Sequence, residues 1–248
     1  MINPQFFLNA PRSFKHGIKI YPPTINDIVK NQAFAQYKDL LLLSQEEIED
    51  IFVQQDPNAE ISEIPTPLEY LMQVCYYNRA IEREIKKVFE VFIHTTVTFV
   101  YGKTQIMVGD FTEVVKNATS VQDLIFITEE DYFDFQNALR ESLGQKPIDP
   151  PNPNEHPKIK KMKAKARYRD RIKAKKGNGI SLGTSLASIC CMGLGITPLN
   201  IGELSYVAFL ALMDYYQEKE KYHLDIDALL AGGDKKKIKP KYWIRNLD

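Results

Sequence analysis

The sequence predicts an α+β protein that is mostly helical. Several segments combine a helix-capping residue with an apolar stripe of helical period. Only residues 97–108 alternate clearly with a period of two, and a proline-rich stretch separates an N-terminal part from a helical C-terminal part. We therefore expect a small antiparallel hairpin in an N-terminal domain and a helical C-terminal domain.

The composition fits a folded protein whose charge is unevenly distributed. The chain has 248 residues, of which 44% are hydrophobic, so it can bury a substantial core. Its formal net charge is zero. Residues 158–176, which we call the basic segment, hold eight lysines and three arginines against Asp170, a net charge of +10. The rest of the chain must therefore carry −10, which predicts an acidic body with one basic segment.

The cysteines and the apolar runs indicate a soluble protein in a reducing, intracellular compartment. Cys75, Cys190 and Cys191 do not form the pattern of a secreted disulfide framework, and we find no signal peptide at the start. The weakly charged run 177–201 contains many glycines and Pro198, so we expect no membrane span there. The adjacent Cys190–Cys191 pair is expected to be buried as small side chains.

In the N-terminal half, the order of elements follows from apolar periodicity and helix caps. Residues 1–11 lack a sustained period and predict an extended arm, and Ile18 and Ile20 predict a short strand before two prolines. Three helix starts then combine a capping hydroxyl with an acidic residue three positions later. These pairs are Thr24 with Asp27, Ser44 with Glu47, and Thr66 with Glu69.

A second helix is expected from about Arg79, after the one that Thr66 begins, so that the two form a helical pair. Residues 97–108 then predict a hairpin that turns at Gly102-Lys103. A short strand at residues 125–127 is followed by a helix that Thr128 caps and that ends near Gly144. The N-terminal α+β domain is therefore expected to cover residues 1–144.

Prolines and charge define the middle of the chain. Five prolines between Pro147 and Pro157 predict a linker, and the basic segment follows directly. Ile159, Met162 and Ala166 give that segment a thin apolar seam. We assign residues 145–178 to the linker and basic segment, and residues 179–248 to the helical C-terminal domain.

The C-terminal domain carries the strongest helical pattern. Apolar residues at spacings of three and four predict a helix from Glu203 to about Lys219. A second, shorter element is expected to end at Gly232-Gly233, where glycine permits a left-handed stop. Lysines then surround Tyr242 and Trp243 in the C-terminal tail, residues 235–248.

No motif in the sequence predicts catalysis, a cofactor or a metal. Gly102-Lys103-Thr104 lacks the glycine that a phosphate-binding loop needs, because Val97 occupies that position. Adjacent cysteines form only a strained disulfide, and the four histidines are scattered without metal-ligand spacing. We therefore expect a protein that is not an enzyme and has no cofactor.

Two segments are candidate binding sites. The tail combines residue types that are enriched in binding hot spots, and the alternative is that it folds back on its own domain. The basic segment could neutralise nucleic-acid phosphates, clamp an acidic protein surface or form a solvated charged helix. The candidate partner-binding residues of the tail are Lys239, Lys241, Tyr242, Trp243 and Arg245. Those of the basic segment are Lys160, Lys161, Lys163, Lys165, Arg167, Arg169 and Arg171.

The order of elements and several stretches resemble morphogenesis proteins of tailed bacteriophages, namely tail-assembly chaperones and baseplate components. The stretches that carry this resemblance are IKIYPPTINDIV, SQEEIED, PTPLEYL, PPNPNE and LLAGGDKKKIKPKYWIRNL. The resemblance implies a non-enzymatic protein that binds other tail or baseplate proteins in the host cytoplasm during assembly, or in the virion. The alternative function is nucleic-acid binding through the basic segment.

Overall fold

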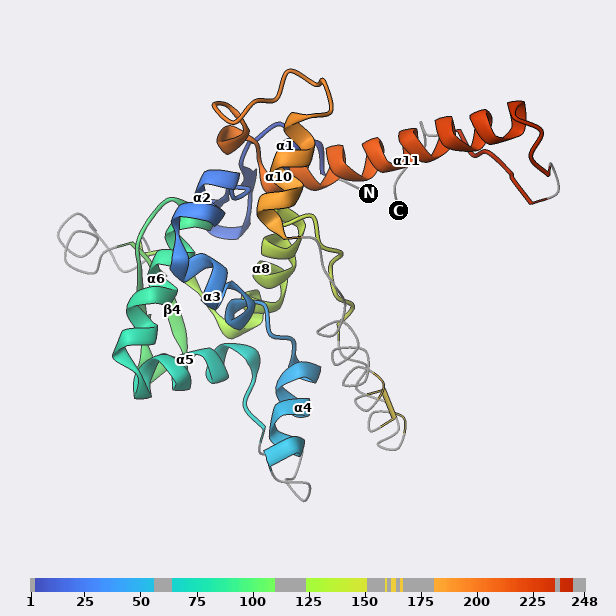
Figure 1. Cartoon of the computed structure of the whole chain (residues 1–248). Coiled ribbons are helices and arrows are strands. Elements are labelled where there is room, and N and C mark those ends of the chain that lie inside the picture. Colours follow the sequence, from blue (N-terminus) through green and yellow to red (C-terminus); the bar gives the residue numbers. More distant parts are fainter. Residues whose placement is uncertain are drawn as a thin grey trace.

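A computed structural model describes residues 3–55, 64–109, 124–150, 181–234 and 237–242, together with residues 159, 162, 163 and 166. The structure confirms a mostly helical α+β fold with small antiparallel sheets (Figure 1). The named helices are α1 Pro4–Phe7, α2 Ile25–Lys30, α3 Gln32–Leu41, α4 Gln45–Gln55, α5 Pro67–Tyr77, α6 Arg79–Ile93, α8 Glu129–Ser142, α10 Leu182–Cys190 and α11 Tyr206–Leu230. The strands are β1 Arg12–Ser13, β2 Lys19–Ile20, β3 Val97–Val100, β4 Gln105–Val108 and β5 Phe126–Ile127. Short 3-10 helices lie at Lys15–Gly17, Tyr101–Lys103 and Ile201–Glu203.

The three capped helix starts predicted from the sequence are confirmed. Before α2, the Asp27 amide donates to Thr24 Oγ1 at 3.2 Å, and the Thr24 amide donates to the Asp27 carboxylate at 2.8 Å. Ser44 before α4 and Thr66 before α5 make the same reciprocal pairs with their acidic partners. Each cap satisfies backbone donors that the first turn of a helix leaves free, and typically contributes about 1 kcal/mol.

The predicted hairpin is also confirmed, and it belongs to a three-stranded sheet. Val97 lies opposite Val108 in the β3–β4 pair, and the connection is the 3-10 turn Tyr101–Lys103. Strand β5 pairs antiparallel with β4, as the short strand expected at residues 125–127. The separate β1–β2 pair includes a strand that we did not predict, because two residues are too few to show a period.

The main core lies between this sheet and the surrounding helices. Phe89 of α6 stacks on Phe135 of α8 with ring centroids 5.9 Å apart, and packs edge-on against Phe99 of β3 at 6.2 Å. Phe34 of α3 contacts Phe92 of α6 at 5.3 Å. These aromatic contacts join elements that are distant in sequence, so they set the positions of the helices around the sheet.

The predicted extended arm at residues 1–11 is wrong. Residues Pro4–Phe7 form the short helix α1, whose start is capped by Asn3: the side chain of Asn3 accepts from the Gln5 amide at 3.0 Å. Phe6 is fully buried in the main core. The burial of one aromatic side chain stabilises a helix that is too short to be recognised by periodicity.

The expected burial of both adjacent cysteines is wrong as well. At the end of α10, Ile189 points inward and is fully buried, whereas Cys190 is half-buried and Cys191 is exposed. Cys75 is the buried cysteine, and burial raises its pKa to about 12. The Cys75 thiol therefore stays protonated near neutral pH.

The linker prediction is not tested, since residues 151–158 lie outside the described part. Asn137 of α8 binds both backbone groups of Ile148: Oδ1 accepts from the Ile148 amide at 2.9 Å, and Nδ2 donates to its carbonyl at 3.1 Å. The chain after α8 therefore first runs along the surface of that helix. The predicted boundaries at residues 144 and 179 stay predictions.

Asp131, in the first turn of α8, gives the fold a pH-dependent contact. Its carboxylate lies 3.1 Å from Lys15 Nζ and 3.3 Å from His16 Nε2, and accepts from Thr128 Oγ1 at 3.0 Å. Burial by itself raises the pKa of Asp131, but the hydrogen bonds from Lys15, Thr128 and His16 outweigh it and hold the pKa below its ordinary value. The charged form therefore stabilises the folded state.

We expect Asp131→Asn to lower the free energy of unfolding at pH 7 by about 1 kcal/mol. A depressed carboxyl pKa contributes stability that is complete above the unfolded pKa of about 4 and is lost as pH falls through the folded pKa. The penalty should therefore shrink in urea titrations between about pH 5 and pH 2. The control is Asp39→Asn, which breaks the exposed pair with Lys38. A penalty for Asp131→Asn that is the same at all pH values would contradict the assignment.

Candidate partner-binding surface

Helix α11 is anchored at its first residues. Ser205 caps it by accepting from the Ala208 amide at 3.1 Å, and its hydroxyl lies 3.5 Å from the Phe7 carbonyl oxygen. The backbone before α11 also pairs with the backbone before α2: the Ile25 amide donates to the Leu204 carbonyl at 2.9 Å, and the Tyr206 amide donates to the Pro23 carbonyl at 2.8 Å. The start of α11 is therefore bound to the N-terminal part of the chain.

A small apolar cluster supports this anchor, and we call it the joint. It brings together α2, α10, the 3-10 turn before α11, and α11 itself. Its buried members are Ile25, Ile189, Ile201 and Phe209. Val207, two positions before Phe209 in α11, belongs to the main core. The joint thus connects the part of the chain after residue 181 to the N-terminal part.

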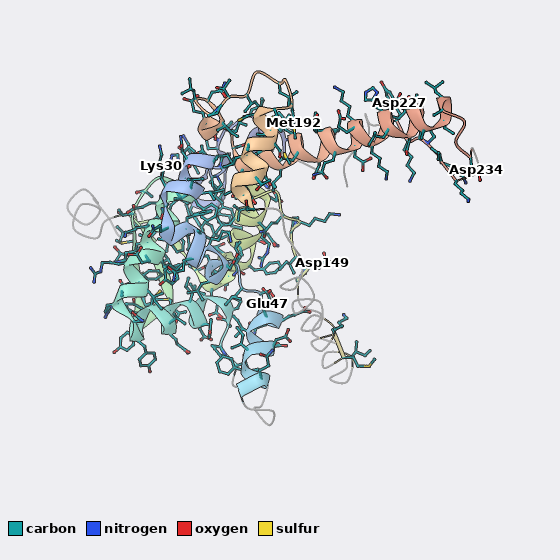
Figure 2. All side chains as sticks on the ribbon, viewed as in Figure 1. Lys30, Glu47, Asp149, Met192, Asp227 and Asp234 are labelled. Atoms are coloured by element: carbon teal, nitrogen blue, oxygen red, sulfur yellow. The ribbon has the colours of Figure 1, made fainter. Side chains whose placement is uncertain are left out.

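Beyond the joint, α11 leaves the rest of the molecule (Figure 1). None of the described residues after Ala211 is buried. Leu224 is 66% exposed and Leu230 is 81% exposed, although the helix continues to Leu230. We call residues 214–234 and 237–242 the C-terminal projection. Figure 2 shows Asp227 near the end of its helix and Asp234 just beyond it.

The expected break of this helix after Lys219 is wrong, because α11 runs without interruption from Tyr206 to Leu230. The stretch between those residues contains no glycine or proline and is rich in good helix formers, so intrinsic propensity sustains the helix where packing does not. The expected stop at Gly232-Gly233 is confirmed. Gly232 has a φ of +90°, which side chains of L-residues rarely adopt.

Gly233 allows the chain to return along α11. Its amide donates to the Ala228 carbonyl at 2.9 Å. A Cβ atom at this position would lie 2.7 Å from that carbonyl oxygen and 2.6 Å from Cδ1 of Ile238. The chain then turns, with the amides of Lys237 and Ile238 both donating to the Asp234 carbonyl. The sequence marks the stop, whereas the close approach that requires Gly233 is visible only in the structure.

The returning part of the tail, residues 237–242, meets the helix through an aromatic contact and opposite charges. The Tyr242 ring packs edge-on against Tyr222 with centroids 5.7 Å apart, while 60% of Tyr242 remains exposed. Carboxylates of the helix and lysines of the tail border a hollow of about 100 Å³. Its lining residues are Glu218, Lys221, Tyr222, Asp225, Lys239 and Lys241.

The structure thus brings Lys239, Lys241 and Tyr242 together on the projection and leaves all three exposed. Trp243 and Arg245 lie outside the described residues, so their predicted contacts are not tested. Of the seven candidate residues of the basic segment, Lys163 alone is described, in a helical and exposed position beside the exposed Met162. The other six candidates, Lys160, Lys161, Lys165, Arg167, Arg169 and Arg171, lie outside the described residues.

Two features of the surface were not found from the sequence. The joint depends on residues more than 160 positions apart, such as Ile25 and Phe209, which no local pattern relates. Leu224 and Leu230 were assigned to a short element of their own, and their exposure could not be read from helical periodicity. Within the described ranges, no helix is both long and apolar enough to cross a membrane, and no group of three or more acidic, histidine or cysteine side chains could hold a metal ion.

The comparisons with known proteins agree with part of the resemblance stated above. Residues 173–248 match the family described as the YomV second domain, which derives from a Bacillus phage protein. Searches of curated proteins and of solved structures return no match. The matched region includes α10, α11 and the C-terminal projection. This region is less than half of the chain. The C-terminal part of this protein is therefore similar to a phage-associated domain.

Proposed function

We propose that this protein is a non-enzymatic assembly protein of a phage tail or baseplate, and that it binds other virion proteins through the C-terminal projection. One observation carries the proposal: a helix anchored by a buried joint presents exposed apolar side chains away from the body, within the region similar to a phage-associated domain. Exposed apolar groups on a projection favour a partner contact, because covering them removes apolar surface from water.

The chemistry of the projection supports a protein partner. Leu224, Leu230 and Tyr242 can be covered by an apolar surface, while lysines and carboxylates around them would form a polar rim. Trp243 follows Tyr242 directly in the sequence, and Trp and Tyr are enriched among residues that dominate binding energy. The return over Gly233 also restricts the tail before binding, which reduces the entropy lost on ordering.

The test is Trp243→Ala in the full chain, with partners taken from the tail and baseplate proteins encoded beside its gene. We expect the thermal midpoint to stay nearly unchanged and the binding free energy measured by calorimetry to weaken by about 2 kcal/mol. Leu199→Ala is the control, since Leu199 is 95% exposed and is not part of the projection.

Two results would contradict the proposal. If Trp243→Ala unfolds the isolated protein, the tail is part of the core and does not serve as a docking element. If no neighbouring tail or baseplate protein binds, while arbitrary DNA binds with strong salt dependence, nucleic-acid binding through the basic segment is the better assignment.

A further inference from the structure

A second surface, far from the projection in sequence, gathers exposed aromatic rings around one arginine. It lies where α5 ends and α6 begins. Asn78 separates the two helices and caps α6 by accepting from the amides of Ala80 and Ile81 at 3.1 and 3.2 Å. This sharp junction leaves Tyr76 54% exposed and Tyr77 84% exposed, with their rings 5.4 Å apart.

Arg79 connects these tyrosines to the β3–β4 hairpin. Its guanidinium carbon lies 5.6 Å from the centre of the Tyr76 ring and 5.1 Å from that of Tyr101. One guanidinium nitrogen also donates to the Tyr101 hydroxyl oxygen at 3.3 Å. Tyr76 and Tyr101 pack edge-on at 5.3 Å. The arginine and the two rings therefore hold each other in one arrangement.

Glu82 holds Arg79 in this position through an ion pair. Its carboxylate is 2.6 Å from Arg79 and 2.9 Å from Lys86, and the side chain is mostly covered. Burial by itself raises the pKa of Glu82, but the hydrogen bonds from Arg79 and Lys86 outweigh this effect. The pKa therefore lies below its ordinary value, and the carboxylate stays charged. Burial raises the pKa of Tyr101, which therefore keeps its proton near neutral pH. The cluster is preorganised before any partner arrives.

The surface around Arg79 has a net positive charge, whereas the chain outside the basic segment has a net negative charge. Within α6, residues 79–87 contain Arg79, Arg83, Lys86 and Lys87 against Glu82 and Glu84, and Lys103 lies in the adjoining hairpin turn, so the net charge is +3. The chain outside the basic segment carries −10. This local reversal of charge favours a negatively charged partner.

We propose that the cluster of Tyr76, Tyr77, Arg79 and Tyr101, which we call the tyrosine–arginine patch, binds an acidic segment of a protein partner that carries an aromatic or aliphatic side chain between its carboxylates. The solvent-exposed ring of Tyr77 can pack against the apolar side chain of the partner segment. Among the described residues, no carboxylate forms an ion pair with Arg83 or Lys103, so these two cations are available to the acidic groups.

The same charges disfavour nucleic acid at this surface. Arg79, Lys86 and Lys87 are each paired with a carboxylate of α6. The two available cations, Arg83 and Lys103, suit a short acidic segment, whereas a continuous phosphate backbone depends on many such contacts. The proposal does not depend on the phage function proposed above, because it uses no residue of the C-terminal projection.

The test is an NMR titration of the full chain with a short peptide in which aspartates flank one tryptophan. We expect the resonances of Tyr77, Arg79 and Lys103 to shift together. A matched peptide with asparagine in place of aspartate, and an oligothymidine strand, should bind at least about tenfold more weakly. Shifts confined to other residues, or tighter binding of the oligothymidine, would overturn the proposal.

Reciprocal tyrosine variants separate this surface from the projection. Tyr77→Ala removes an exposed ring and should lower the affinity for the acidic peptide by about tenfold or more, the scale of a binding hot spot. Tyr242→Ala removes an exposed tyrosine of the projection and should leave peptide binding unchanged. The paired substitution Arg83→Glu with Lys103→Glu should abolish binding without unfolding the chain. If Tyr77→Ala and Tyr242→Ala have the same effect, the patch is not the binding site.

Discussion

Phe209→Ala is expected to cost about 3–5 kcal/mol in the free energy of unfolding, the range for truncating a buried phenylalanine. Phe209 is 3% exposed and lies in the joint with Ile25, Ile189 and Ile201. Removal of its ring would leave a cavity where four elements meet, and the surrounding backbone is held by hydrogen bonds that limit collapse. Urea unfolding followed by circular dichroism measures this loss.

The same variant should loosen the C-terminal part before the rest of the molecule. Hydrogen exchange of the first turns of α11 should become faster than exchange in α6, because α6 belongs to the main core and the joint does not. Leu199→Ala, at a 95% exposed position, is the control and should stay within about 0.5 kcal/mol of the original protein. A loss below about 1 kcal/mol for Phe209→Ala would show that the joint contributes little to the fold.

Gly233→Ala is expected to release the returning part of the tail from α11. The added Cβ would lie 2.7 Å from the Ala228 carbonyl oxygen, a backbone atom that cannot move without disturbing the last turn of the helix. Overpacking of this kind typically costs about 1–3 kcal/mol. The contact that it opposes is small and includes an edge-on tyrosine pair, the partly covered Ile238, and exposed lysines beside carboxylates, so the tail should detach while the helix persists.

Trypsin cleavage after Lys237 and Lys241 measures the release, because Pro240 protects the bond after Lys239. The cleavage should become about tenfold faster if the substitution favours the released state by about 1.4 kcal/mol. Nuclear Overhauser contacts between the rings of Tyr222 and Tyr242 should disappear in parallel. Gly102→Ala is the matched control, because no atom lies within 4 Å of a Cβ built at Gly102. Unchanged cleavage in Gly233→Ala would mean that the return tolerates a side chain and that the predicted crowding is absent.

Local chemistry made the helical elements predictable. Thr24, Ser44 and Thr66 each satisfy backbone donors within three residues, so the signal for these helix starts is contained in a short stretch of sequence. The β3–β4 hairpin was predictable for the same reason, since alternation and turn lie within residues 97–108. Helix α1 was missed because Phe6 is stabilised by burial against distant residues rather than by a local pattern.

For the candidate sites, the sequence by itself determined the composition of the tail, the charge of the basic segment and the glycine stop after α11, because each is a property of consecutive residues. Only the tertiary structure decided that α11 is anchored through Phe209 and projects beyond Ala211, and that Arg79 joins Tyr76 to Tyr101. These arrangements depend on which side chains become buried together. Burial is set by packing between elements distant in the chain, and no single stretch of sequence contains that information.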